Sequence, residues 1–216
     1  NVFTVVKRQP HMNIIPCKWV FRIKRDVSGN ILKFKACIVA KGYAQQEGFD
    51  YHETFAPTLH TQSLRLIFIL SVIHTPTTNN IEQLDIKTAF LNAGLPEDIY
   101  VGIPPGYNDI TGNPINEKTH CFKLNRALYG LKQSPLEWYK LLHIILTERG
   151  YTNTSADPCY YYKYVKGCSV PVMVTVYVDD CIIAYPKQLE HIWLADKAKI
   201  CETYKIDDLD DINFCL

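Results

Sequence analysis

Residues 170–185, VPVMVTVYVDDCIIAY, decide the fold of this chain. Two apolar, largely β-branched runs flank the tetrapeptide Tyr177-Val178-Asp179-Asp180. Such runs, broken by a short polar segment, predict a β-hairpin with carboxylates at its tip. Neighbouring carboxylates repel each other, so the cluster is costly unless a cation neutralises it. Taken alone, the segment fits an ordinary exposed Asp-Asp turn equally well.

A third carboxylate strengthens the metal hypothesis. Residues 81–86 predict a strand and residues 87–92 the start of a helix, so Asp85 lies near a strand end. Together with Asp179 and Asp180 it offers oxygen ligands of the kind that Mg²⁺ takes. Two ions about 4 Å apart clamp the attacking and leaving oxygens of a phosphoryl displacement. The alternative for Asp85 is a helix cap ahead of Lys87.

Composition bounds the class of protein. The chain has 216 residues, 47% of them hydrophobic, which suits one large domain or two small lobes. It has no run near the ~20 apolar residues of a membrane span and no signal-peptide pattern. It begins with Asn1 rather than Met, so we expect a piece of a longer protein. Eight cysteines in apolar stretches, without a C-x-x-C pair, predict reduced intracellular thiols and no zinc site.

Charge is distributed unevenly although the net charge is only +1. Basic residues gather in the first fifty positions: Lys7, Arg8, Lys18, Arg22, Lys24, Arg25, Lys33, Lys35 and Lys41. Acidic residues gather near the end: Glu202, Asp207, Asp208, Asp210 and Asp211. A basic lobe with an acidic, metal-binding centre suits a polyanionic substrate with cations, and plain solvated surface is the alternative.

The element pattern predicts an α+β fold. Residues 18–40 alternate apolar and basic residues around a turn, which predicts a β-hairpin with one basic face. Ser63–Ile73 predicts a buried helix, and 102–118 predicts a mobile loop. A second helix starts with Ser134 as N-cap and ends near Gly150, with an apolar face of Trp138, Leu141, Leu142, Ile145 and Leu146. This order of elements fits an antiparallel sheet backed by helices.

Seven strings carry a family resemblance. They are WVFRIKR at 19–25, VAKGYAQ at 39–45, DYHETFAP at 50–57, QLDIKTAFL at 83–91, LYGLKQSP at 128–135, ADPC at 156–159 and YVDD at 177–180. In this order and at this spacing the chain resembles the reverse transcriptase domain of copia-type (Pseudoviridae-like) long-terminal-repeat retrotransposon Pol polyproteins. The resemblance runs nearly end to end.

The resemblance implies a reverse-transcriptase-like palm, an antiparallel sheet backed by helices, with a fingers subdomain. We expect fingers at 1–78, palm with the first catalytic Asp at 79–100, a fingers insertion at 101–128, and palm again at 129–216. Thumb and RNase H regions are expected to be absent. The implied activity is RNA-directed and DNA-directed DNA polymerisation, in which a primer 3′-hydroxyl attacks the α-phosphate of a dNTP.

The resemblance also implies roles for single residues. Asp85 and Asp179 are implied to be the catalytic residues that bind two Mg²⁺ or Mn²⁺ ions, and Asp180 is implied to be a third and less critical carboxylate. Nucleotide contacts fall to Lys24, Arg25 and Lys35 at the β- and γ-phosphates, the Ile86 carbonyl at a metal, Phe90 as steric gate against ribose, and Tyr129 and Gly130. Template and primer contacts fall to Lys132, Gln133, Tyr177 and Val178.

The implied partners are an RNA or DNA template with its primer, dNTPs, and the rest of a Pol polyprotein, with integrase upstream and RNase H downstream. No membrane is expected, and the implied location is a cytoplasmic virus-like particle or the nucleus.

Several positions depart from the family pattern. Cys37 replaces an expected basic residue, Leu136 an Arg, Asp210 a Gly and Ile103 a frequent Gln. These departures, and a chain that ends where a primer-gripping segment would follow, support an alternative: an inactive or domesticated relic that at most binds nucleic acid. A third hypothesis, another two-metal enzyme such as a nuclease, fits the carboxylates but explains neither Phe90 nor residues 129–135.

Overall fold

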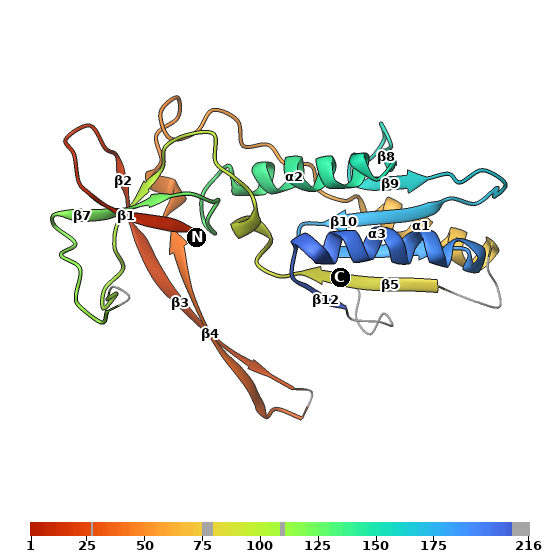
Figure 1. Ribbon diagram of the computed structural model, residues 1–216, viewed down its shortest axis with the longest axis horizontal. Helices are drawn as coiled ribbons and strands as arrows, with labels where there is room; N and C mark the ends of the chain where they lie inside the picture. The colour runs from red at the N-terminus through yellow and green to blue at the C-terminus, as the bar shows by residue number, and fades with distance from the viewer. Residues whose placement is uncertain (27, 75–79, 109–110, 209–216) are drawn as a thin grey trace. The chain divides into compact units, whose positions relative to one another are not determined.

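The computed structural model describes the chain except residues 27, 75–79, 109–110 and 209–216 (Figure 1). Asp210, one of the departures from the family pattern, therefore lies outside the described residues. The chain folds into two compact units, Asn1–Phe55 with Phe90–Glu137 and Ala56–Ala89 with Trp138–Leu216. These units divide the chain at other places than the sequence analysis expects: residues 56–78 join the second unit, and residues 90–100 and 129–137 join the first.

The first unit contains a four-stranded sheet in the order β1-β7-β6-β2. Its strands are β1 (Phe3–Lys7), β7 (His120–Leu124), β6 (Tyr100–Val101) and β2 (Ile14–Ile15). Ile15, Ile99, Val101 and Phe122 form a core in which none is more than 1% exposed. The 3-10 turn η1 (Gly42–Ala44) follows the strand of residues 31–40, and the 3-10 turn η2 (Ala89–Asn92) follows the strand of residues 80–86.

The predicted basic hairpin is confirmed. Strands β3 (Cys17–Arg25) and β4 (Ile31–Ala40) pair antiparallel as a sheet of their own. Arg22 lies opposite Lys35, and Lys24 opposite Lys33, so four cationic residues share one face of the ribbon. The other face carries Phe21 and Phe34, which are 75% and 72% exposed. Like charges directly opposite each other destabilise a ribbon, which favours binding of an anion on that face.

A close backbone crossing holds β4 against the segment before the second long helix. Ala40 donates its N–H to the Tyr129 carbonyl at 2.8 Å. Gly130 has φ +90, and a Cβ on it would lie 2.1 Å from the Ala40 carbonyl oxygen. The close approach that Gly130 permits is therefore to the protein's own strand β4.

The second unit contains a six-stranded antiparallel sheet in the order β12-β5-β11-β10-β9-β8. Its strands are β12 (Ile206–Asp208), β5 (Asn80–Ile86), β11 (Asp180–Tyr185), β10 (Val172–Tyr177), β9 (Tyr160–Lys163) and β8 (Thr152–Asn153). With helices on this sheet, the predicted α+β class is confirmed.

Helix α1 (Thr61–His74) covers one face of this sheet. Ile67 is fully buried against Met173, Ile182 and Ala184. The predicted helix is present, but the prediction that it is buried is wrong. Its outer side is open, with Leu66, Ile69, Val72 and Ile73 between 45% and 63% exposed. A helix on a sheet buries one stripe only, and an apolar run does not say which side is covered.

Helix α2 (Ser134–Glu148) is present as predicted, with Trp138, Leu142, Ile145 and Leu146 buried. It ends where expected: Gly150 has φ +83, and Tyr151 donates its N–H to the Leu146 carbonyl. Ser134 is the first residue of this helix, and its hydroxyl donates to the Leu128 carbonyl at 2.7 Å, while its role as N-cap stays a prediction.

Helix α3 (Glu190–Thr203) follows the 3-10 turn η3 (Lys187–Leu189) and packs on the sheet face that carries Glu82, which is opposite to the face covered by α1. Glu82 of β5 is its anchor. It accepts hydrogen bonds from Lys197 at 2.7 Å, from Trp193 at 3.0 Å and from the Tyr185 hydroxyl. Burial acts to raise the pKa of Glu82, but the hydrogen bonds from Lys197, Tyr185 and Trp193 outweigh it and lower that pKa. The contacts join β5, β11 and α3.

The seven cysteines among the described residues are free thiols. Cys121, Cys159 and Cys181 are buried, whereas Cys201 is exposed on α3.

Replacing Gly130 tests the backbone crossing. Gly130→Ala is expected to lower the free energy of unfolding by about 3 kcal/mol or more, since the new Cβ meets a backbone carbonyl at positive φ. Gly48→Ala is the matched control, because Gly48 has φ +78 and nothing within 4 Å of its Cβ position. It should lose only about 1 kcal/mol. Chemical denaturation measures both, and equal losses would contradict the steric argument.

Glu82→Gln tests the anchor of α3. Loss of charge-assisted hydrogen bonds should lower the free energy of unfolding at pH 7 by about 1–3 kcal/mol. Because the folded pKa is depressed, this contribution is present above the unfolded pKa of about 4.3 and disappears as pH falls through the folded value. Denaturation from pH 7 to pH 3 should show the two proteins converging in acid, and a difference that does not change with pH would refute the assignment.

Candidate active site

The tip of the predicted YVDD hairpin is a two-residue loop. Tyr177 pairs with Asp180, which leaves Val178 and Asp179 between strands β10 and β11. Val178 has φ 58, a left-handed conformation that a β-branched residue seldom adopts. Positive φ at the first loop residue only is the sign pattern of a type II′ turn. The predicted hairpin is confirmed, and its turn is strained.

The neighbouring strand brings Asp85 to this turn. In the antiparallel pairing of β5 with β11, Asp85 lies directly opposite Asp180. Directly opposite residues project to the same face of a sheet, with Cβ atoms about 5 Å apart. The N–H of Ile86 donates to the Asp179 carbonyl at 2.9 Å. Asp85 therefore meets Asp179 and Asp180, which lie far from it in sequence, at the ends of two adjacent strands.

The buried thiol of Cys181 lies close enough to all three acidic side chains for their charges to affect its pKa. Burial raises the pKa of Cys181 to about 12, and the charges of Asp180, Asp179 and Asp85 add to the rise. Carboxylates gathered in this way repel one another. Their donors are oxygens, the kind of ligand that a hard divalent cation takes. As their side chains stand, no three His, Cys, Asp or Glu residues in the described part of the chain enclose a metal position.

Backbone strain accompanies the carboxylates on both strands. Val178 and Thr88, φ 58 and 53, are the two non-glycine residues of positive φ in the part of the chain that the structure describes. One lies beside Asp179, and the other follows Asp85 by three positions. Strained residues of this kind persist where the surroundings over-determine them, and they concentrate at functional sites.

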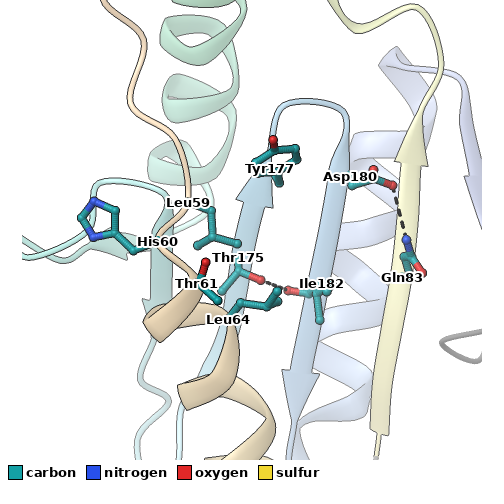
Figure 2. A pocket seen from close by; sticks show the side chains of 9 residues that line it. All are labelled: Leu59, His60, Thr61, Leu64, Gln83, Thr175, Tyr177, Asp180 and Ile182. Atoms are coloured by element: carbon teal, nitrogen blue, oxygen red, sulfur yellow. Dashed lines mark hydrogen bonds between the residues drawn. The ribbon is translucent and has the colours of Figure 1, made fainter. Parts of the chain in front are cut away.

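Gln83 is a site residue that the sequence analysis missed. Its amide Nε2 donates to Asp180 Oδ1 at 3.3 Å (Figure 2). The signal was available, because Gln83 precedes Asp85 by two residues on a strand and so shares its face.

A cavity of about 230 Å³ opens on this face beside Asp180. The start of α1 and strands β5, β10 and β11 line it, as Figure 2 shows, with residues Leu59, His60, Thr61, Leu64, Gln83, Thr175, Tyr177, Asp180 and Ile182. Tyr177 and Val178, predicted to meet template or primer, are 43% and 36% exposed at the hairpin tip. The carboxylate face is therefore hollow and reachable.

The residues predicted to meet the nucleotide base and sugar lie in the first unit. The rings of Phe90 and Tyr129 contact each other, with centroids 4.8 Å apart. Lys132 is exposed and places its ammonium 2.8 Å from the Tyr51 hydroxyl.

Gln133 does not reach outward as the sequence analysis expects. Its side chain is 1% exposed, accepts from Gln45 at 2.9 Å and donates to the Asp50 carbonyl at 2.7 Å. In this structure it is an internal amide that links three segments of the first unit, because buried polar groups must find hydrogen-bond partners.

Of the three residues predicted to contact phosphates, two lie on the basic face of the β3–β4 ribbon and one forms a hydrogen bond within its turn. Lys24 and Lys35 lie on the basic face of the β3–β4 ribbon. Arg25 follows a register irregularity and donates to the Gly29 carbonyl at 2.9 Å, so its guanidinium is used in the turn. Cys37, the departure from the family pattern, lies on the basic face in the row of Lys35.

Comparisons with known proteins identify the family. The family described as reverse transcriptase (RNA-dependent DNA polymerase) matches residues 1–216. The Pol polyprotein from transposon TNT 1-94 of Nicotiana tabacum is 37% identical over 169 residues, 78% of this chain and 12% of that protein. The Pol polyprotein from transposon RE1 of Arabidopsis thaliana is 38% identical over 173 residues, 80% of this chain and 11% of that protein.

The chain is also similar to a yeast protein and to a solved structure at lower identity. The transposon Ty1-H Gag-Pol polyprotein of Saccharomyces cerevisiae is 27% identical over 175 residues, 79% of this chain and 8% of that protein. Among solved structures, a foamy viral protease-reverse transcriptase in complex with double-stranded DNA matches with a TM-score of 0.43 and 16% identity, over 94% of this chain and 27% of that chain.

The chain spans about an eighth of the length of the plant relatives. Within the described residues, no helix is both long and apolar enough to cross a membrane. The match over all 216 residues, with relatives above 30% identity across most of the chain, shows that it belongs to the reverse transcriptase (RNA-dependent DNA polymerase) family, as found in copia/Ty1-type retrotransposon Pol polyproteins.

Proposed function

We propose that this chain is the polymerising core of an RNA- and DNA-directed DNA polymerase, with Asp85, Asp179 and Asp180 as its catalytic carboxylates. The supporting observation is the register of β5 with β11, which sets Asp85 opposite Asp180 beside the turn that carries Asp179. Two like charges directly opposite each other destabilise a sheet, and a cation bound between them would remove that cost.

The reaction is nucleotidyl transfer. The oxygen of a primer 3′-hydroxyl forms a bond to the α-phosphorus of a dNTP, and the bond from that phosphorus to the bridging oxygen breaks to release pyrophosphate. Divalent cations, Mg²⁺ or Mn²⁺, supply charge neutralisation at the attacking and leaving oxygens when bound. Asp85 and Asp179 are the proposed principal ligands, with Asp180 as the third carboxylate and the Ile86 carbonyl as an additional oxygen donor.

The remaining residues bind and orient. We assign the role of palm to the six-stranded sheet with its helices and the role of fingers to the first unit. Lys24 and Lys35, on one face of the ribbon, would attract the triphosphate, Lys acting as a point charge. Phe90, supported by the ring of Tyr129, would fill the space beneath the sugar and exclude a 2′-hydroxyl. Template, primer and the rest of a Pol polyprotein are the proposed partners.

Carboxylate replacement tests the catalytic assignment. Asp85→Asn or Asp179→Asn should lower Mg²⁺-dependent primer extension by at least about a hundredfold, because each removes a charged ligand. Asp180→Asn should be milder. Thermal unfolding should be unchanged or slightly improved in each, since repulsion is relieved.

The control for this series is Asp98→Asn, which removes a carboxylate that is 67% exposed and paired with Lys123. It should extend primers normally. Comparable activity in all four variants would rule out the mechanism. A wild-type chain that binds dNTP and template but extends no primer would favour the alternative of an inactive relic that only binds nucleic acid.

Phe90→Val tests polymerase identity. It opens space beneath the sugar and leaves every proposed metal ligand in place. Ribonucleotide incorporation should rise relative to deoxyribonucleotide incorporation by at least about tenfold, on the order of 1.4 kcal/mol of discrimination. Phe90→Tyr keeps the bulk of the ring and should leave the ratio unchanged. Single-nucleotide extension with each nucleotide measures both, and an unmoved ratio in Phe90→Val would make Phe90 a packing residue.

A further inference from the structure

The two loop residues of the β10–β11 hairpin adopt a conformation that their sequence does not favour. Val178 takes φ 58, where a type II′ turn ordinarily has Gly. Asp179 follows it and tolerates left-handed backbone better than most residues. A type I′ turn, with positive φ at both loop residues, is therefore an accessible competitor for the same two-residue loop. Something outside the hairpin has to select between the two turns.

The two turns differ in the direction of the peptide group between the loop residues. In types I′ and II′ this group is rotated by about half a turn, which reverses the direction of the Val178 carbonyl. That carbonyl oxygen accepts a hydrogen bond from the Trp138 indole Nε1 at 2.6 Å. The acceptor is the very atom that would turn away in the competing conformation.

Trp138 is built to hold a fixed position. It lies in the first turns of α2 and is 2% exposed. Its ring meets that of Tyr204 edge to face, with centroids 6.4 Å apart and planes at 77°. A buried indole has one donor and few alternative places to direct it, so the N–H acts as a rigid support.

A second support completes the frame. Ile86 of β5 donates its N–H to the Asp179 carbonyl at 2.9 Å. The carbonyl oxygens of both loop residues are thus held, one by the strand that carries Asp85 and the other by helix α2. Rotation of the Val178–Asp179 peptide would break the Trp138 bond and shift the backbone from which the Asp179 carboxylate projects.

We infer that Trp138 is a positioning residue for Asp179: its indole N–H selects the type II′ form of the YVDD turn and so sets the carboxylate for cation binding. The inference rests on the proposed function of Asp179. Trp138 itself contacts neither substrate nor cation, so its contribution is expected in cation affinity and in turnover, with nucleotide affinity little changed.

Trp138→Phe removes the donor and keeps most of the ring. In the whole chain, backbone amide exchange at residues 177–180 should quicken by at least about fivefold, the change that corresponds to one ordinary hydrogen bond. Mn²⁺ affinity, followed by electron paramagnetic resonance of the free ion, should fall by about the same factor. In primer extension kcat should fall while KM for dNTP stays within about twofold.

Trp193→Phe is the matched control. Trp193 is 1% exposed and donates its indole N–H to Glu82 Oε2 at 3.0 Å, away from the turn. This variant should lose stability as Trp138→Phe does, and keep wild-type exchange at residues 177–180 and wild-type Mn²⁺ affinity.

Val178→Gly supplies the rescue. Gly favours type II′ at this place without help. In that background Trp138→Phe should change Mn²⁺ affinity by less than about twofold. If Trp138→Phe alone does not fold, the double variant decides: affinity equal to that of Val178→Gly supports the inference, and a further fivefold loss overturns it.

The remaining outcomes are distinct. Equal exchange and equal Mn²⁺ affinity in Trp138→Phe and Trp193→Phe would make Trp138 a core residue and overturn the inference. A wild-type chain that binds no Mn²⁺ would overturn the proposed function. In that case the exchange at residues 177–180 still decides whether Trp138 selects the turn.

Discussion

The antiparallel register between β5 and β11 is the constraint on which the rest of the site depends. It sets Asp85 opposite Asp180, and the next residue, Ile86, donates to the Asp179 carbonyl. A slip by one residue would send Asp85 to the other face of the sheet, since side chains alternate. Leu84 and Ile86 are buried on one face, and Ile182 and Ala184 are buried under α1 on the other. A slip would also turn Glu82 away from Lys197 and Trp193 and move each apolar side chain off its present packing partners, so the contacts made on the two faces specify the register.

Well-packed contacts of the second unit hold the strained tip of the β10–β11 hairpin in place. Its hairpin tip combines repelling carboxylates with a β-branched residue at positive φ, and each feature costs free energy. The surrounding contacts are well satisfied: Glu82 binds α3 through Lys197 and Trp193, and Trp138 holds the Val178 carbonyl. Folding free energy from the core can offset strain at the tip, as is common where a charged ligand completes a site.

Much of the fold could be predicted from local pattern. Alternation predicted the basic hairpin, two apolar runs around a polar break predicted the YVDD hairpin, and apolar periodicity with Gly150 predicted α2 and its end. Patterns failed where a residue's partner lies far away in sequence. Gln133 looks available to a template, yet it is buried between Gln45 and Asp50. Short-range sequence carries no information on such partners.

For the candidate site, the sequence by itself determined the chemistry: which residues are carboxylates, that two lie at a hairpin tip, and which family pattern they follow. Only the tertiary structure decided how Asp85 is set against Asp180, that Gln83 binds Asp180, and that Trp138 reaches the Val178 carbonyl. The physical reason is range. Periodicity and turn chemistry act over a few residues, whereas strand register and buried hydrogen bonds are settled by burial of apolar surface across the whole unit.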